Sequence, residues 1–403
     1  MKKTSCVRVT GPLEAHVPGY RRELARRGYS PWTALFHMQL LAHVSRWLSQ
    51  NGVEPAEFDQ RRAEQFLADR CADGYVRFRS PRGLMPLLEY FRGRGVVPEP
   101  VPSVPTDPCA KLLEEFVGYL FTERGLAEPT VVGYRWVAAS FLSTCPCEGN
   151  GDGLANLTAV EVNAFLLAEC ARRSVGSANN VVVALRALLR FMYLNGHVPT
   201  PLADAVPWVA TWRDGGRSRA LTASQVAALL AGCDRRSTAG RRDFAILTVL
   251  ARLGLRAAEV ASLTLDDFDW RIGEVVVAGK GNRRDRLPLP TDVGEAVADY
   301  CRRGRPHNSC RVLFLHVRAP YTAMSSSAVS DVVLRASARA GIAPVRAHQL
   351  RHSTASAMRR AGAPLFEIGQ VLRHHHTVTT AIYAKDDLDA LAGLARPWPG
   401  DWS

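Results

Sequence analysis

A proline-rich segment, PEPVPSVPTDP from Pro98 to Pro108, limits what this chain can fold into more than any other feature. Proline has no amide donor and a fixed φ, so such a run continues neither a helix nor a central strand. We therefore take residues 98–109 as a linker. With 403 residues, the chain is long enough for two or three domains, each with its own core.

Apolar residues recur at helical spacing on both sides of this linker, which predicts two helical bundles. In the first bundle, one apolar stripe is expected through Trp32, Leu35, Phe36, Leu40, Val44 and Trp47. In chain order we expect a loose leader (1–19), a first bundle (20–97), the linker, a second bundle (110–198), a second linker (199–219) and a C-terminal domain (220–403).

The two bundles resemble each other in sequence. Three pairs of segments match in order: RRGYSP (26–31) with ERGLAEPT (123–130), AEQFLADRC (63–71) with VNAFLLAEC (162–170), and EYFRGRGVVP (89–98) with RFMYLNGHVP (190–199). We interpret the match as a duplicated bundle. The alternative is a coincidence between two amphipathic bundles.

The C-terminal domain is expected to mix helices with a small antiparallel sheet. Thr222 is placed to cap its first helix, and a later helix over 242–253 is expected to end at Gly254. β-Branched residues then predict a strand over 274–278, a turn, and a returning strand over 284–289. The fold class is therefore mainly α-helical bundles followed by an α+β domain.

Charge and cysteine content narrow the function. The net charge of +13 favours a polyanionic partner, with nucleic acid as the first candidate, although a basic surface also serves solubility. The chain has no apolar run long enough to cross a membrane and no secretory signal at its start. The nine cysteines are scattered, which is typical of a reducing, cytoplasmic compartment.

The segment from Ala347 to Tyr383 concentrates groups that suit phosphodiester chemistry. His348 and Arg351 are three apart and share a helix face, and His352 lies one turn from His348. Arginine matches phosphate oxygens, histidine transfers protons near neutral pH, and a tyrosine hydroxyl can act as a nucleophile. Each of these residues alone is more often structural. The triple histidine 374–376 is not expected to bind metal, because consecutive side chains point in different directions.

Taken together, these motifs resemble the tyrosine recombinases, the lambda-integrase and Xer-type family of site-specific DNA recombinases. The matching segments are Gly254-Leu255-Arg256-Ala257-Ala258-Glu259, Gly279-Lys280-Gly281, His348-Gln349-Leu350-Arg351-His352, Leu372-Arg373-His374 and Thr379-Thr380-Ala381-Ile382-Tyr383. One residue departs from the family pattern: Arg373 stands where the family usually has glycine. We expect it to shift the local backbone without abolishing activity.

The resemblance implies a role for each matching residue. Arg256 and Arg351 would bracket the scissile phosphate, and His348 would be the base. Lys280 would be the acid, His374 a hydrogen-bond donor, Tyr383 the nucleophile and Glu259 a supporting acid. It also implies that residues 110–198 are a core-binding, SAM-like domain. No metal or cofactor is implied.

The same resemblance implies the partners. They are double-stranded DNA and a homotetramer on paired sites, with a monomer possible without DNA and related recombinases or DNA-bending proteins as accessory partners. The extra bundle would extend the DNA footprint or contact proteins, and we favour a mobile-element integrase. The alternatives are a DNA-binding architectural protein of the same fold that has lost its chemistry, and a type IB-like topoisomerase.

Overall fold

The computed structural model describes residues 7–100, 107–145, 152–208, 220–279 and 283–373. The chain divides into two compact units, Pro100–Gly216 and the combination of Met1–Glu99 with Arg217–Ser403. Three large hydrophobic cores form in the described residues, one for each expected folded segment. In the ranges described, no helix has the length and apolar character that a membrane crossing requires.

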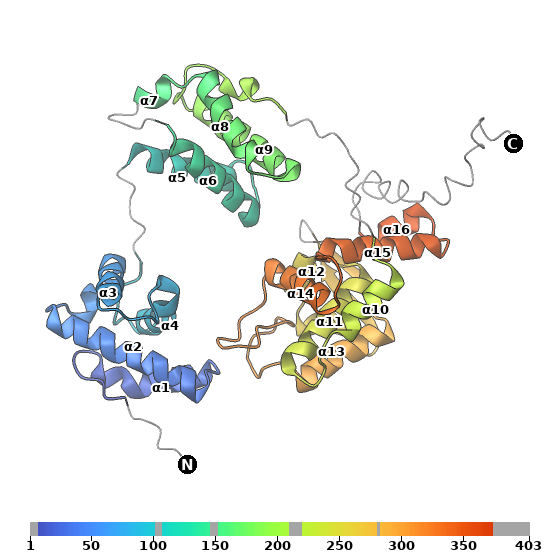
Figure 1. The fold of residues 1–403 in the computed structure, drawn as a ribbon, viewed down its shortest axis with the longest axis horizontal. Helices are drawn as coiled ribbons and strands as arrows, with labels where there is room; N and C mark the ends of the chain where they lie inside the picture. The colour runs from blue at the N-terminus through green and yellow to red at the C-terminus, as the bar shows by residue number, and fades with distance from the viewer. Residues whose placement is uncertain (1–6, 101–106, 146–151, 209–219, 280–282, 374–403) are drawn as a thin grey trace, which may run out of the picture. The chain divides into compact units, whose positions relative to one another are not determined.

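The described part of the first bundle is built from four α-helices (Figure 1) and two short 3-10 helices. Its elements are η1 (Glu14–His16), α1 (Val17–Arg26), α2 (Pro31–Gln50), η2 (Pro55–Glu57), α3 (Gln60–Ala72) and α4 (Pro81–Arg92). Side-chain caps mark two helix starts: Ser30 accepts from the Thr33 amide at 3.2 Å, and Asp59 accepts from the Arg62 amide at 2.8 Å.

Two expectations for this bundle differ from the structure. Residues 7–19 are not a loose leader, because Val9 and Leu13 are buried in the bundle core and α1 already begins at Val17. The Ser45 hydroxyl holds this segment by donating to the Thr10 carbonyl at 2.8 Å. Trp32 does not join the buried stripe of α2; it lies in the first turn, 68% exposed.

The second bundle also contains four main helices in the described residues. Its elements are α5 (Pro108–Thr122), α6 (Glu128–Leu142), the short α7 (Asp152–Ala155), α8 (Ala159–Ala171), α9 (Val175–Leu194) and η3 (Leu202–Ala205). Asp107 caps α5 by accepting from the Ala110 amide at 2.9 Å. Helix α9 packs against α6, α8 and η3.

The C-terminal part is a helical domain with one small sheet. Its helices are α10 (Ala223–Ala231), α11 (Thr238–Leu253), α12 (Ala257–Ser262), η4 (Leu265–Asp267), α13 (Thr291–Arg303), α14 (Ser326–Arg339), α15 (Ala347–Arg360) and α16 (Leu365–Val371). Helix α11 lies at its centre and packs against α10, α13, α14 and α15 (Figure 1). Thr222 caps α10 as predicted, accepting from the Gln225 amide at 3.2 Å.

The small sheet confirms both predicted strands. Strand β2 (Glu274–Ala278) pairs antiparallel with β3 (Arg284–Pro288), with Val276 opposite Arg286. A short strand that the sequence did not indicate, β1 (Phe268–Asp269), adds to the other edge, so the order is β1-β2-β3. Its two residues are too few to carry an alternating pattern.

A left-handed turn and the last two described helices meet at one place. Gly254 ends α11 with φ +59°, as expected for a helix C-terminus, and a Cβ there would lie 2.7 Å from a Leu372 methyl. Ala355 of α15 packs with Ile368 and Leu372 in a small apolar cluster. The Thr354 hydroxyl donates to the Ala251 carbonyl at 2.8 Å, which fixes α15 to α11. This junction positions the site.

Candidate active site

Arg256 and Glu259 form the first pair of the site, at the start of α12. The Arg256 amide donates to Glu259 Oε2 at 2.7 Å, and its Nη1 donates to Oε1 at 2.8 Å. Glu259 is 5% exposed, whereas the Arg256 side chain is 44% exposed. Burial raises the pKa of Glu259, but the Arg256 amide and the charges of Arg373 and Arg256 outweigh burial, so the net pKa is lowered. The carboxylate is therefore ionised and holds an arginine that still faces solvent.

Arg351 ties three elements together from α15. It is 1% exposed. Its Nη1 donates to the Gly254 carbonyl at 2.6 Å and its Nη2 to the Leu372 carbonyl. The guanidinium thus joins the turn before Arg256 to the C-terminal end of α16. A buried guanidinium in this role sets the geometry of the surrounding backbone as well as the local charge.

His348 lies one turn before His352 on α15, and the two imidazoles are in contact. Their Nε2 atoms are 2.8 Å apart and their ring centroids 4.4 Å apart, edge to face. Burial lowers the pKa of His348, and the nearby charges of Arg351 and Arg256 lower it further. His348 is therefore a neutral imidazole near pH 7, which is the form that accepts a proton.

Arg373 also belongs to this cluster. The sequence showed it only as a departure from the family pattern. It follows α16 with φ +54°, and its side chain is 7% exposed. Its Nη2 donates to Glu259 Oε2 at 2.7 Å, and its Nε lies 3.8 Å from Asp285 Oδ2 on β3. Glu259 lies 114 residues away, and no spacing rule links the two residues. The sequence therefore signalled the role of Arg373 only through a charged residue at a position where glycine is usual.

The structure brings together four of the seven predicted site residues: Arg256, Glu259, His348 and Arg351. The other three, Lys280, His374 and Tyr383, lie outside the described residues. The hairpin beside Lys280 closes through a hydrogen bond from the Gly279 amide to the Arg283 carbonyl at 2.8 Å. Among the described residues, no group of three His, Cys, Asp or Glu side chains is placed to hold a metal ion.

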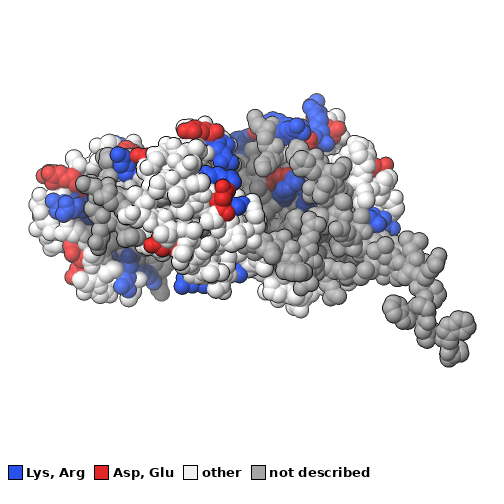
Figure 2. Space-filling model, turned by 90° about the horizontal axis from the view of Figure 1, so that it is seen from above, with Lys and Arg blue, Asp and Glu red and all other residues white. Residues whose placement is uncertain are grey.

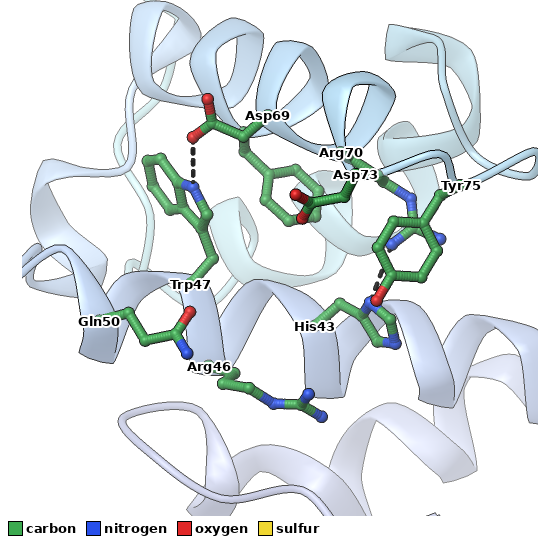
Figure 3. Close-up of a pocket in the computed structure, with 9 residues that line it drawn as sticks. His43, Arg46, Trp47, Gln50, Asp69, Arg70, Asp73 and Tyr75 are labelled. Atoms are coloured by element: carbon green, nitrogen blue, oxygen red, sulfur yellow. Dashed lines mark hydrogen bonds between the residues drawn. The ribbon is translucent and has the colours of Figure 1, made fainter.

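A polar hollow in the first bundle is the second place where charged groups gather (Figure 3). Trp47 Nε1 donates to Asp69 at 2.8 Å, and Arg70 Nη1 lies 3.0 Å from His43 Nδ1. The Arg70 guanidinium also stacks 4.2 Å from the centre of the Tyr75 ring. These contacts pair α2 with α3 and the loop after it, so the hollow is part of the bundle's own scaffold.

The surface charge of the described residues is mixed on the face drawn in Figure 2. Basic side chains there lie beside acidic ones, with large uncharged areas between them. The described basic side chains on that face do not form one continuous patch.

The sequence is similar to those of known proteins. The model of the phage integrase family matches residues 219–389. The putative integrase/recombinase y4rA of Sinorhizobium fredii is 39% identical over 97% of this chain and 96% of its own length. The tyrosine recombinase XerD of Mycobacterium tuberculosis is 30% identical over 72% of this chain and 96% of its own length.

Two solved structures share the fold. XerH recombinase, bound to a palindromic difH substrate, superposes with a TM-score of 0.59 at 17% identity, covering 73% of this chain and 98% of XerH. A lambda integrase dimer bound to a COC' core site gives 0.55 at 18% identity, covering 72% and 97%.

Fold, site and relatives together define the class of protein: an enzyme that breaks and rejoins DNA. Within that class, the chain belongs to the tyrosine recombinase family, which confirms the resemblance seen in the motifs.

Proposed function

We propose that this protein is a site-specific tyrosine recombinase that cuts and rejoins double-stranded DNA through a 3′-phosphotyrosyl intermediate, in the integration or excision of a mobile element. The observation that carries the proposal is the convergence of Arg256, His348 and Arg351. They come from α12 and α15, nearly 100 residues apart in sequence, and lie close enough for both arginines to lower the pKa of the histidine.

Charge neutralisation is the first requirement, because an anionic phosphodiester repels a nucleophile. Arg256 is the half-exposed arginine, held from behind by Glu259, so its outer edge is the surface that meets a non-bridging oxygen. Arg351 adds positive charge from beneath and holds the Gly254 turn that carries Arg256. Both stabilise the extra negative charge of the pentavalent transition state.

Proton transfers complete the step. Neutral His348 accepts the proton of the Tyr383 hydroxyl as its oxygen bonds to phosphorus. The bond from phosphorus to the 5′-oxygen breaks, and that oxygen takes a proton from Lys280, with His374 donating a hydrogen bond to the phosphate. The products are a 3′-phosphotyrosyl enzyme and a 5′-hydroxyl. A 5′-hydroxyl from a partner duplex reverses the reaction.

The helical bundles would hold the DNA. In our proposal, residues 110–198 are the core-binding domain and residues 20–97 a duplicated copy of it. The duplication is supported by element order: the matched segments fall at the α1–α2 and α5–α6 junctions, inside α3 and α8, and at the ends of α4 and α9. The XerH and lambda integrase structures were solved with DNA, and the latter is a dimer. Recombination joins two duplexes, so two copies on each would place four copies of this chain on paired sites.

The test is a covalent adduct. Protein–DNA complexes from cells expressing the wild type would be denatured and purified, and the attached DNA sequenced to give the target site. A nicked suicide duplex of that site should then trap the wild type but not Tyr383→Phe, which should still bind the DNA. Tyr75→Phe is the matched control, because it removes one hydroxyl from the first bundle and should leave adduct formation unchanged.

Three other outcomes would contradict the proposal. DNA binding without any wild-type adduct would identify an architectural protein. Relaxation of a plasmid that lacks the recovered site would identify a topoisomerase. Adduct formation by Tyr383→Phe would remove Tyr383 from the nucleophile role.

A further inference from the structure

We propose that Arg373 is a positioning residue for Arg256, acting through the carboxylate that the two arginines share. The inference rests on the proposed function, since it assigns Arg373 a part in the same DNA cleavage step. Arg373 would not touch the phosphate. It would fix Glu259, and Glu259 would fix the guanidinium that does.

The backbone at Arg373 is the first reason to look for such a role. Helix α16 ends at Leu372, whose amide donates to the Ile368 carbonyl, and Arg373 follows in the left-handed region with φ +54°. Glycine is the usual residue at this point after a helix, because any Cβ is disfavoured there. An arginine in this position has to be held by something else in the fold.

The Arg373 side chain is held by a buried ion pair. Arg373 reaches across to Glu259 at 2.7 Å, and the two partner side chains are only 7% and 6% exposed. A buried ion pair is far more directional than a solvated one, because neither partner can turn to water instead. No described residue accepts a hydrogen bond from Arg373 Nη1, so Glu259 is the main described partner of this guanidinium.

The two carboxylate oxygens of Glu259 have different hydrogen-bond donors. Oε2 accepts from both the Arg256 amide and Arg373 Nη2, while Oε1 accepts from Arg256 Nη1. With Oε2 fixed from two directions, the carboxylate plane is set, and Oε1 holds Arg256 Nη1 at one angle. Without Arg373, Oε2 would keep only the Arg256 amide, and the carboxylate plane would be less firmly fixed.

Charge balance points the same way. Arg256 and Glu259 alone form a neutral pair, whereas Arg256, Glu259 and Arg373 together carry one net positive charge. Asp285 offsets part of this, but its carboxylate is 3.8 Å from Arg373 Nε and 42% exposed. The third charge therefore lets Glu259 brace Arg256 without cancelling the positive field at the phosphate.

The experiment compares Arg373→Gly with the wild type on the suicide duplex under single-turnover conditions with saturating DNA. Glycine suits the left-handed backbone, so the variant should fold and bind DNA with a Kd within about twofold of the wild type. We expect adduct formation to slow about tenfold or more, as is usual when a charge-stabilising donor is displaced. Arg373→Lys should restore part of the rate, because a lysine still brings one positive donor to Glu259.

A second substrate separates positioning from general damage. A methylphosphonate at the scissile position replaces one non-bridging oxygen by a methyl group and removes its negative charge, so the guanidinium of Arg256 matters less. The defect of Arg373→Gly, measured against the wild type on the same substrate, should shrink severalfold there. Arg256→Ala should show the same pattern. Arg252→Gln, which breaks an exposed pair with Asp292 (2.6 Å), is the control and should match the wild type on both substrates.

Three results would overturn the inference. Equal rates for Arg373→Gly and the wild type on the phosphate duplex would show that Arg373 does not act on the step. An equal loss on both substrates would show a purely structural role. Arg373→Ala indistinguishable from Arg373→Lys would show that charge is not what Arg373 contributes. Absence of any wild-type adduct would instead overturn the proposed function, and this inference with it.

Discussion

Two buried arginines, Arg351 in the C-terminal domain and Arg70 in the first bundle, show how similar chemistry can serve different ends. Both are more than nine-tenths buried, and both donate to backbone carbonyls. Arg70 bonds to His43 and the Arg77 carbonyl and stacks on Tyr75, all within a single bundle (Figure 3). Arg351 joins the turn before α12 to the end of α16, where two further arginines meet.

The difference lies in what surrounds each arginine. Around Arg70, the tryptophan Trp47 and the carboxylate of Asp69 satisfy each other at 2.8 Å. Around Arg351, the neighbours are a half-exposed Arg256, a neutral His348 and a buried Glu259. The first set closes on itself and holds a bundle together. The second set leaves an arginine and a base facing outward, which is what a reaction centre requires.

The largest effect should come from Arg351→Ala. We expect adduct formation to fall by two to three orders of magnitude, roughly the loss seen when one preorganised charge donor is removed. The carbonyls of Gly254 and Leu372 would also lose their donor, which should cost about 1–3 kcal/mol in the free energy of unfolding. Single-turnover kinetics and denaturant unfolding measure the two effects. A normal cleavage rate in a folded variant would show that Arg351 is only a structural residue like Arg70.

Arg70→Ala should lower stability but leave cleavage nearly unchanged. We expect it to destabilise the first bundle by about 1–3 kcal/mol, because the His43 ring and the Arg77 carbonyl lose a buried donor. Adduct formation at saturating DNA should stay within about twofold of the wild type. Arg46→Ala is the matched control, since Arg46 lines the same hollow on its exposed side. A lost adduct with the bundle still folded would contradict the contrast drawn between the two arginines.

Local patterns predicted the parts of this molecule that depend on neighbours in sequence. The Arg256–Glu259 pair at three-residue spacing, the Thr222 cap and the two strands of the hairpin were all readable, because each is set within a few residues. The placement of His348 and Arg351 on one helix followed from the same periodicity.

Long-range contacts were beyond those patterns. The Arg373–Glu259 pair and the Arg351–Gly254 bond join residues 114 and 97 apart, and no periodicity encodes such a pairing. The burial of Val9 and Leu13 was missed for a related reason, since a short segment without helical spacing can still pack onto a bundle built elsewhere. Only the fold makes these residues neighbours.

Acid should lower the stability of the first bundle through His37. Burial lowers the pKa of His37, in the core of the first bundle, to about 4 from its ordinary 6.5. Because the folded-state pKa is the lower one, the unfolded chain binds more protons between these values, and the bundle loses stability as pH falls from 6.5 toward 4. At pH 5 this amounts to about 2 kcal/mol. Comparing unfolding of the wild type and His37→Gln at pH 7.5 and 5 measures it; an equal pH dependence in both would contradict it.

The smallest effect concerns the pH dependence of cleavage. A histidine base with an ordinary pKa of 6.5 would lose about fourfold in its neutral fraction between pH 7.5 and 6. Since burial, Arg351 and Arg256 all lower the pKa of His348, that loss should move to more acid pH, and the rate should fall by less than fourfold over this range. Single-turnover rates between pH 5 and 8, paired with an NMR titration of the His348 ring, measure both quantities. A fourfold fall centred on pH 6.5 would mean that the charges around His348 do not reach it in the DNA complex, and the contrast with the closed cluster around Arg70 would then rest on geometry alone.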